Sequence, residues 1–81
     1  KRFPQRVTNV RVREKRPFDK LPDVLELVAK AEAEVSPDGG RVLLRYSGTE
    51  PLLRVMIEGA DQAVITGWAN AIADAVRSEL G

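Results

Sequence analysis

Polar and apolar residues alternate in the segment 6–13, near the start of the chain. One side of this segment carries Thr8, Val10 and Val12, and the other side carries Asn9, Arg11 and Arg13. A period of two residues predicts a β-strand with one buried face. Pro17 ends the strand, because a proline nitrogen has no hydrogen to donate to a neighbouring strand.

Two later segments repeat their apolar residues at helical spacing. The first carries Leu21, Val24, Leu25, Val28, Ala31 and Val35, and the second carries Val64, Ile65, Trp68, Ile72, Val76 and Leu80. These stripes predict two amphipathic helices. Pro22 suits the first turn of the first helix, and Asp61 is a good N-terminal cap for the second. The segment 36–40, which contains Pro37 and two glycines, predicts a turn between them.

Two further apolar runs, 41–46 and 52–58, flank the loop 47–51 and predict an antiparallel hairpin. If Tyr46 pairs with Leu53, one face of the hairpin carries the apolar residues Val42, Leu44, Tyr46, Leu53, Val55 and Ile57. The opposite face then pairs Arg41 with Glu58, Leu43 with Met56, and Arg45 with Arg54. Met56 shares this face with the arginines, where it lies either at the surface or against another domain.

The charges in this register favour an anion site. Arg41 opposite Glu58 is a favourable cross-strand pair, whereas Arg45 opposite Arg54 destabilises a sheet by up to about 1 kcal/mol. A hairpin that sets two guanidinium groups side by side therefore gains from an anion bound between them.

The predicted order of elements is β-α-β-β-α, in a single domain of 81 residues. Both helices must cover the apolar face of the sheet. The expected fold class is therefore α+β, with a small, mostly antiparallel sheet and two helices packed on one face. No apolar run approaches the length of a membrane span.

The loop between the hairpin strands offers several groups to an anion. Ser47 and Thr49 supply hydroxyl donors, and Gly48 permits a positive φ and a close approach of the backbone. Arg45 and Arg54 enter from the two strand ends, with planar guanidinium groups that match phosphate oxygens. An alternative interpretation is a plain hairpin turn, in which an acidic loop residue pairs with one arginine on a solvated edge.

The chain contains neither histidine nor cysteine. Ser47 therefore has no histidine base to activate it, and we expect the loop to bind phosphate without breaking its bonds. No thiolate or imidazole is present to hold a metal ion, and we expect no metal site in this domain. The absence of cysteine fits a reducing cytoplasm, which is the expected compartment.

Two segments closely resemble the C-terminal domain of the α-D-phosphohexomutases: residues 45–59, RYSGTEPLLRVMIEG, and residues 9–17, NVRVREKRP. The resemblance covers nearly the whole chain, in the same order and spacing. Within the family, the chain is most similar to the bacterial branch that acts on glucosamine phosphate. This resemblance favours phosphate binding over a plain turn.

The resemblance implies a four-domain isomerase that interconverts hexosamine or hexose 6-phosphate and 1-phosphate. Glucosamine is the expected sugar, and phosphomannomutase or phosphoglucomutase activity is the alternative. The first domain of such enzymes carries a catalytic phosphoserine, the second binds magnesium, and the third contacts the sugar hydroxyls. The fourth domain, which this chain resembles, closes over the cleft and holds the substrate's phosphate. The chain alone is therefore expected to hold no catalytic residue and no cofactor.

The resemblance also assigns roles to individual residues. The implied phosphate contacts are Arg45, Ser47, Gly48, Thr49 and Arg54. Glu50 and Pro51 shape the loop, and Tyr46 makes no contact. Residues 1–5 are expected to be a linker from the preceding domains, and residues 6–81 the phosphate-binding domain. The expected partners are a phosphosugar and those preceding domains, with no nucleic acid and no membrane.

Basic residues are concentrated near the start of the chain. Those in the first twenty positions are Lys1, Arg2, Arg6, Arg11, Arg13, Lys15, Arg16 and Lys20. They suggest a rival interpretation, a free-standing regulatory or nucleic-acid-binding α+β module. They equally suit the solvated face of a strand and a loop, or contacts with other domains. Aromatic residues for base stacking are scarce, so nucleic acid is not the expected partner.

Overall fold

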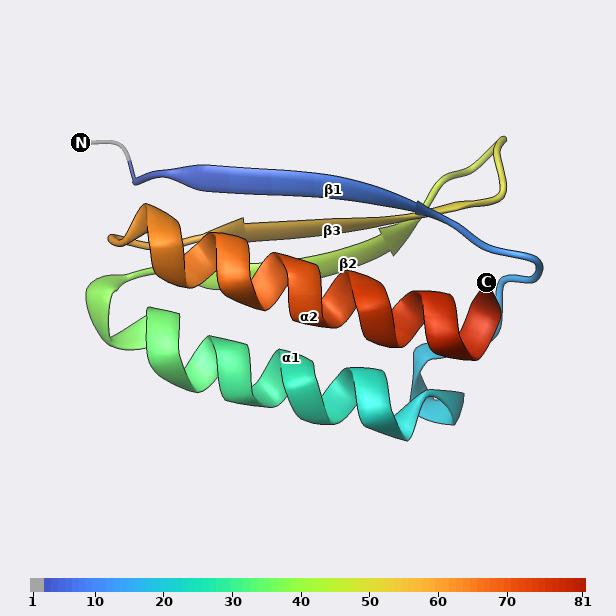
Figure 1. Cartoon of the computed structure of the whole chain (residues 1–81), viewed down its shortest axis with the longest axis horizontal. Helices are drawn as coiled ribbons and strands as arrows, with labels where there is room; N and C mark the ends of the chain where they lie inside the picture. Colours follow the sequence, from blue (N-terminus) through green and yellow to red (C-terminus); the bar gives the residue numbers. More distant parts are fainter. Residues whose placement is uncertain (1–2) are drawn as a thin grey trace.

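The computed structural model describes residues 3–81 as a three-stranded antiparallel sheet with two helices on one face (Figure 1). The elements are β1 (Gln5–Arg11), η1 (Phe18–Lys20), α1 (Pro22–Val35), η2 (Ser36–Asp38), β2 (Arg41–Tyr46), β3 (Leu52–Glu58) and α2 (Gln62–Leu80), where η marks a short 3-10 helix. The predicted order β-α-β-β-α and the α+β class are confirmed. Lys1 and Arg2 of the predicted linker lie outside the described residues, and Gln5 opens β1.

The strands are ordered β1-β3-β2, so β3 lies in the centre and pairs with both neighbours. The predicted hairpin register is confirmed along its whole length, with Tyr46 opposite Leu53 and Arg45 opposite Arg54. On the other side of β3, Asn9 of β1 also lies opposite Arg54. Asn9, Arg54 and Arg45 therefore form one row across the width of the sheet.

The core lies between the sheet and the helices, on the face predicted to be apolar. Leu53, Val55 and Ile57 of the central strand are fully buried there. α2 packs against β1 and β3, whereas α1 packs against β2 and α2. The buried residues of α2 are Ile65, Ala69, Ile72, Ala73, Val76 and Leu80. Arg45 and Arg54 lie on the opposite face of the sheet, away from the helices.

The helix stripes differ from the prediction at their edges. Leu25 was expected in the core but is 39% exposed. It follows the buried Val24 by one residue, which rotates it by about 100° around the helix axis. Trp68 is half buried at the margin, and its indole Nε1 donates a hydrogen bond to Glu34 Oε1 at 2.7 Å. Trp68 therefore links α2 to α1 instead of filling the centre of the core.

β1 ends at Arg11, two residues earlier than the alternating pattern predicts. The next two N–H groups have other partners: Val12 donates to the Pro51 carbonyl at 2.8 Å, and Arg13 donates to the Leu80 carbonyl at 2.7 Å. These bonds direct the chain away from the sheet, toward the hairpin loop and the end of α2. Val12 nevertheless remains buried, as the pattern predicts.

Local features of the predicted turn and cap place the remaining elements. The Asp61 carboxylate caps α2 and accepts hydrogen bonds from the N–H groups of Ala63 at 2.9 Å and Val64 at 3.2 Å. A Cβ added at Gly40 would lie 2.3 Å from the Glu58 carbonyl oxygen, so only glycine allows this close approach of β2 to β3. No helix within residues 3–81 is both long and apolar enough to cross a membrane.

In the described part of the chain, no helix covers the second face of the sheet (Figure 1). Val7, Met56 and Leu43 form an apolar row on this open face. Val7 and Leu43 are 48% and 43% exposed, whereas Met56 is only 9% exposed. Met56 is therefore nearly buried within this chain, because β1 and β2 flank it on both sides.

Candidate anion-binding site

The open face of the sheet contains a hollow of about 230 Å³ next to the hairpin loop. Its lining residues are Asn9, Arg45, Tyr46, Ser47, Gly48, Glu50, Leu52 and Arg54. Four of the five predicted phosphate contacts, Arg45, Ser47, Gly48 and Arg54, therefore meet around one space. Thr49, the fifth, does not line the hollow.

Arg45 and Arg54 lie directly opposite each other where the hairpin strands approach the loop. Among residues 3–81, neither arginine forms an ion pair. By contrast, the Arg41 guanidinium contacts the Glu58 carboxylate at 2.8 Å in a row farther along the same face. Two guanidinium groups and one carboxylate, that of Glu50, therefore border the open space, and the excess of positive charge favours an anion.

Asn9 is a residue of this site that the hairpin pattern alone did not identify. Its side-chain oxygen Oδ1 accepts a long hydrogen bond of 3.4 Å from Arg54 Nε. Asn9 thereby contacts the Arg54 guanidinium at the edge of the hollow, which both residues line. The available signal was its place on the outward side of the first predicted strand, but that strand could be placed beside β3 only once the sheet order was known.

Hydrogen bonds within the loop fix its shape. The Ser47 N–H donates to the Leu52 carbonyl at 2.9 Å, and the Leu52 N–H donates to the Glu50 carbonyl at 2.8 Å. The Ser47 hydroxyl oxygen accepts from the N–H groups of Thr49 at 3.4 Å and Glu50 at 3.2 Å. Because this hydroxyl acts as an acceptor inside the loop, its own proton is free to be donated to a ligand.

Gly48 does not use the positive φ that glycine permits. Within residues 3–81, the one residue with positive φ is Gly39, at 88°. A Cβ added at Gly48 would meet no heavy atom within 4 Å. Gly48 therefore contributes open space above the backbone. Of its two expected roles, a positive φ and a close approach of the ligand, this geometry allows the second.

Tyr46 borders the hollow, but its hydroxyl is already bound elsewhere. The hydroxyl donates to the Arg16 carbonyl at 2.5 Å, and the ring stacks on Phe18 with centroids 5.0 Å apart. Burial raises the pKa of Tyr46 above its ordinary value of 10.0, and the nearby charge of Arg16 partly opposes this shift. Tyr46 thus anchors the end of β2 through its hydroxyl and its ring.

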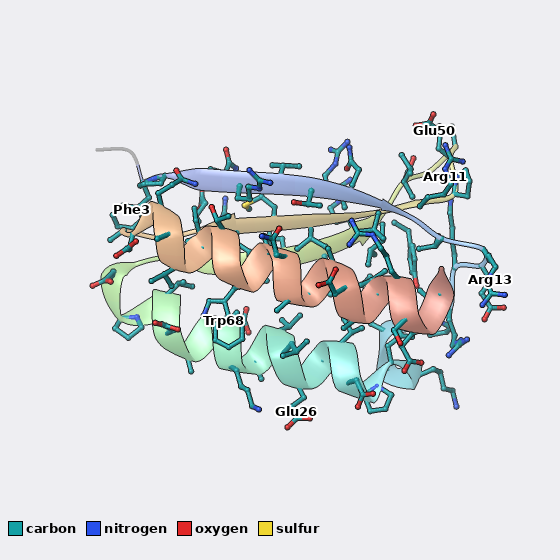
Figure 2. The ribbon with its side chains drawn as sticks, viewed as in Figure 1. Phe3, Arg11, Arg13, Glu26, Glu50 and Trp68 are labelled. Carbon is teal, nitrogen blue, oxygen red and sulfur yellow. The ribbon has the colours of Figure 1, made fainter. Side chains whose placement is uncertain are left out.

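The basic segment near the start of the chain lies close to the loop. Figure 2 shows Arg11 and Glu50 at the same end of the sheet, with Arg13 beside the end of α2. The Lys15 ammonium donates a hydrogen bond to the Ser47 carbonyl, and Arg16 pairs with Glu14 at 2.7 Å. Lys15 and Arg16 are therefore engaged within the domain, and Lys15 is a second neighbour of the loop that the spacing did not reveal.

The site contains no arrangement for nucleophilic catalysis or metal binding in the described residues. Across residues 3–81, the hydrogen bonds at the Ser47 hydroxyl come from the backbone amides of Thr49 and Glu50, and no base contacts it. The same residues contain no group of three or more histidine, cysteine or acidic side chains that could hold a metal ion. This arrangement can bind and orient an anion.

Comparison with known proteins shows which family the chain resembles over most of its length. Residues 7–75 match the family described as phosphoglucomutase/phosphomannomutase, C-terminal domain. The chain is 55% identical to the phosphoglucosamine mutase of Geotalea uraniireducens, across 98% of this chain and 17% of that protein. It is 51% identical to the phosphoglucosamine mutase of Geobacter metallireducens, with the same coverage. The chain thus spans about a sixth of the length of these relatives.

A solved structure is also similar. The Aspergillus fumigatus N-acetylphosphoglucosamine mutase, in complex with GlcNAc-6P and magnesium, superposes with a TM-score of 0.73 and 27% sequence identity. The match covers 94% of this chain and 16% of the fungal protein. The same fold therefore occurs as one part of a much longer enzyme.

Proposed function

Since this chain belongs to the family of phosphoglucomutase/phosphomannomutase C-terminal domains, we propose that its hollow binds the phosphate group of a phosphosugar. One observation carries the proposal: Arg45 and Arg54 face each other beside the loop, and within residues 3–81 neither forms an ion pair. A bound phosphate replaces the repulsion of the two guanidinium groups with two attractive contacts.

The proposed ligand contacts follow from the groups around the hollow. Arg45 and Arg54 donate to phosphate oxygens from opposite strands, and Asn9 holds the Arg54 side chain in place. The Ser47 hydroxyl donates a hydrogen bond to a phosphate oxygen, and Gly48 leaves room for the phosphate to approach the backbone. Thr49, which lies outside the lining of the hollow, completes the proposed set of contacts as the neighbour of Gly48 in the same loop.

We also propose the reaction of the longer protein. It is an isomerase that interconverts glucosamine 6-phosphate and glucosamine 1-phosphate, because the relatives that share 51% and 55% identity over 79 residues of this chain are phosphoglucosamine mutases. A glucose or mannose phosphate is the alternative, in keeping with the family's description. The phosphate site at the hollow serves such a reaction by holding the phosphate that is not being transferred.

The catalytic phosphoserine and the magnesium site belong, in this proposal, to preceding domains. The predicted linker, residues 1–5, then shortens by one residue, because Gln5 of β1 already pairs with Glu58; the residues before it connect the preceding domains to the phosphate-binding domain. Phosphate binding then drives closure of the domain over the cleft, to the extent that the closed state binds the phosphate more tightly than the open state.

Calorimetric titration of the chain with glucosamine 6-phosphate tests the phosphate site. Arg54→Ala removes a charged hydrogen-bond donor and should weaken binding by about tenfold or more. Arg11→Ala, on the same end of the sheet but outside the hollow, is the matched control and should bind nearly as the unaltered chain does. A short RNA that binds tightly, and loses affinity with Arg11→Ala but not with Arg54→Ala, would contradict the proposal in favour of a nucleic-acid-binding module.

A further inference from the structure

The loop Ser47–Pro51 is held at both ends by one segment of the chain, the connection 12–17 between β1 and η1. At the far end of the loop, the Pro51 carbonyl accepts a hydrogen bond of 2.8 Å from the Val12 N–H. At the near end, the Ser47 carbonyl accepts a hydrogen bond from the Lys15 ammonium. The position of the loop is therefore coupled to the position of this connection.

Two neighbouring residues of the connection, Lys15 and Arg16, form hydrogen bonds with two neighbouring residues at the start of the loop, Tyr46 and Ser47. Lys15 donates to the Ser47 carbonyl, and the Tyr46 hydroxyl donates to the Arg16 carbonyl at 2.5 Å. We call these four residues the brace. Stacking of the Tyr46 ring on Phe18, with an interplanar angle of 15°, fixes the brace laterally.

The connection is itself bonded to the end of α2. The Arg13 N–H donates to the Leu80 carbonyl at 2.7 Å, and the Arg16 guanidinium lies 3.6 Å from the Glu79 carboxylate. The brace thus links the loop to the helical layer of the domain as well as to the sheet. An exposed loop that is ordered in advance loses less conformational entropy when it binds a ligand.

Lys15 acts on one particular peptide unit of the loop. Its ammonium contacts the carbonyl of Ser47, and the N–H of the same peptide unit belongs to Gly48, which lines the hollow. In the described residues this N–H has no hydrogen-bond partner. A cation at one end of a peptide unit polarises it and makes the N–H at the other end a stronger donor.

We propose that Lys15 is a positioning residue of the phosphate site, which fixes the Ser47–Gly48 peptide unit and strengthens the Gly48 N–H as a donor to phosphate. This inference rests on the proposed phosphate binding. Lys15 does not line the hollow, so its effect passes through the loop backbone. The brace therefore extends the phosphate site beyond the motif, to the basic connection that follows β1.

The test compares three variants of the 81-residue chain in titrations with glucosamine 6-phosphate, followed by backbone amide NMR shifts. Lys15→Met should weaken binding about fivefold, as expected for the loss of one hydrogen bond of ordinary net strength. Lys15→Arg keeps a charged donor and should restore most of the affinity that Lys15→Met loses. Lys20→Met, the matched control, removes the same charge from exposed η1 and should bind as the unaltered chain does.

A second measurement separates this inference from the proposed function. In the absence of ligand, Lys15→Met should shift the Gly48 amide resonance and Lys20→Met should not, while both keep the melting temperature of the unaltered chain. An unshifted Gly48 amide, or equal loss of affinity in both methionine variants, overturns the positioning role while leaving phosphate binding intact. Absence of any binding by the unaltered chain overturns the proposed function itself, and the positioning role with it.

Discussion

The repulsion between Arg45 and Arg54 can be measured as a gain in stability when it is removed. We predict that Arg45→Gln raises the melting temperature of the ligand-free chain at low salt. The cross-strand penalty for like charges is at most about 1 kcal/mol, and about half of that is expected here because both side chains are exposed. For a domain of this size, about 0.5 kcal/mol corresponds to roughly 2–4 °C.

Arg41→Gln is the matched control for this prediction. It makes the same substitution on the same strand and face, but it removes the ion pair with Glu58, whose atoms are 2.8 Å apart. The melting temperature should therefore fall by a similar amount. Comparing the two variants cancels the change in strand propensity that arginine to glutamine brings.

Thermal unfolding followed by circular dichroism, at low salt and at about 0.5 M NaCl, checks both variants. Added salt should reduce both shifts in melting temperature, because at about 0.5 M it shortens the range of interactions between exposed charges to a few ångströms. The reasoning is refuted if Arg45→Gln lowers the melting temperature at low salt. It is also refuted if both variants shift in the same direction, since Arg45 would then stabilise the ligand-free hairpin as Arg41 does.

Three further predictions concern single side chains. Gly48→Ala should leave the melting temperature nearly unchanged, because its Cβ meets nothing within 4 Å, yet weaken phosphate binding in a calorimetric titration. Asp61→Ala should lower stability by about 1 kcal/mol in denaturant unfolding, since the cap of α2 is lost. Burial raises the pKa of Tyr46, so the folded state holds the phenol proton more tightly than the unfolded state. The free energy of unfolding should therefore fall as pH rises above 10.0, and Tyr46→Phe should lack that part of the fall.

The hairpin could be predicted from the sequence because its two strands constrain each other. Alternation fixes which residues face the core, and the short loop allows few registers, so pairing Tyr46 with Leu53 determines every other pair. The same argument placed Arg45 opposite Arg54. The half of the site that lies within one continuous segment was therefore accessible without a structure.

The other half depends on contacts between distant segments. Asn9 reaches Arg54 because β1 pairs with β3, and Lys15 reaches Ser47 because β1 ends early and the chain turns toward the loop. Neither the sheet order nor the early end of β1 follows from periodicity, since both depend on long-range hydrogen bonds. Leu25 lies at the edge of the helical stripe, and its exposure could be read only from the structure, which shows how much of the stripe the sheet and α2 cover.

The central claim is that the hollow between Arg45, Arg54 and Ser47 recognises the phosphate of a phosphosugar. Backbone amide NMR of the chain, titrated in parallel with glucosamine 6-phosphate and with glucosamine, tests it most directly. The phosphorylated sugar should produce saturable shifts at Ser47, Gly48 and Thr49, and the unphosphorylated sugar should produce none. Equal responses to both sugars, or shifts confined to other parts of the domain, would contradict the claim.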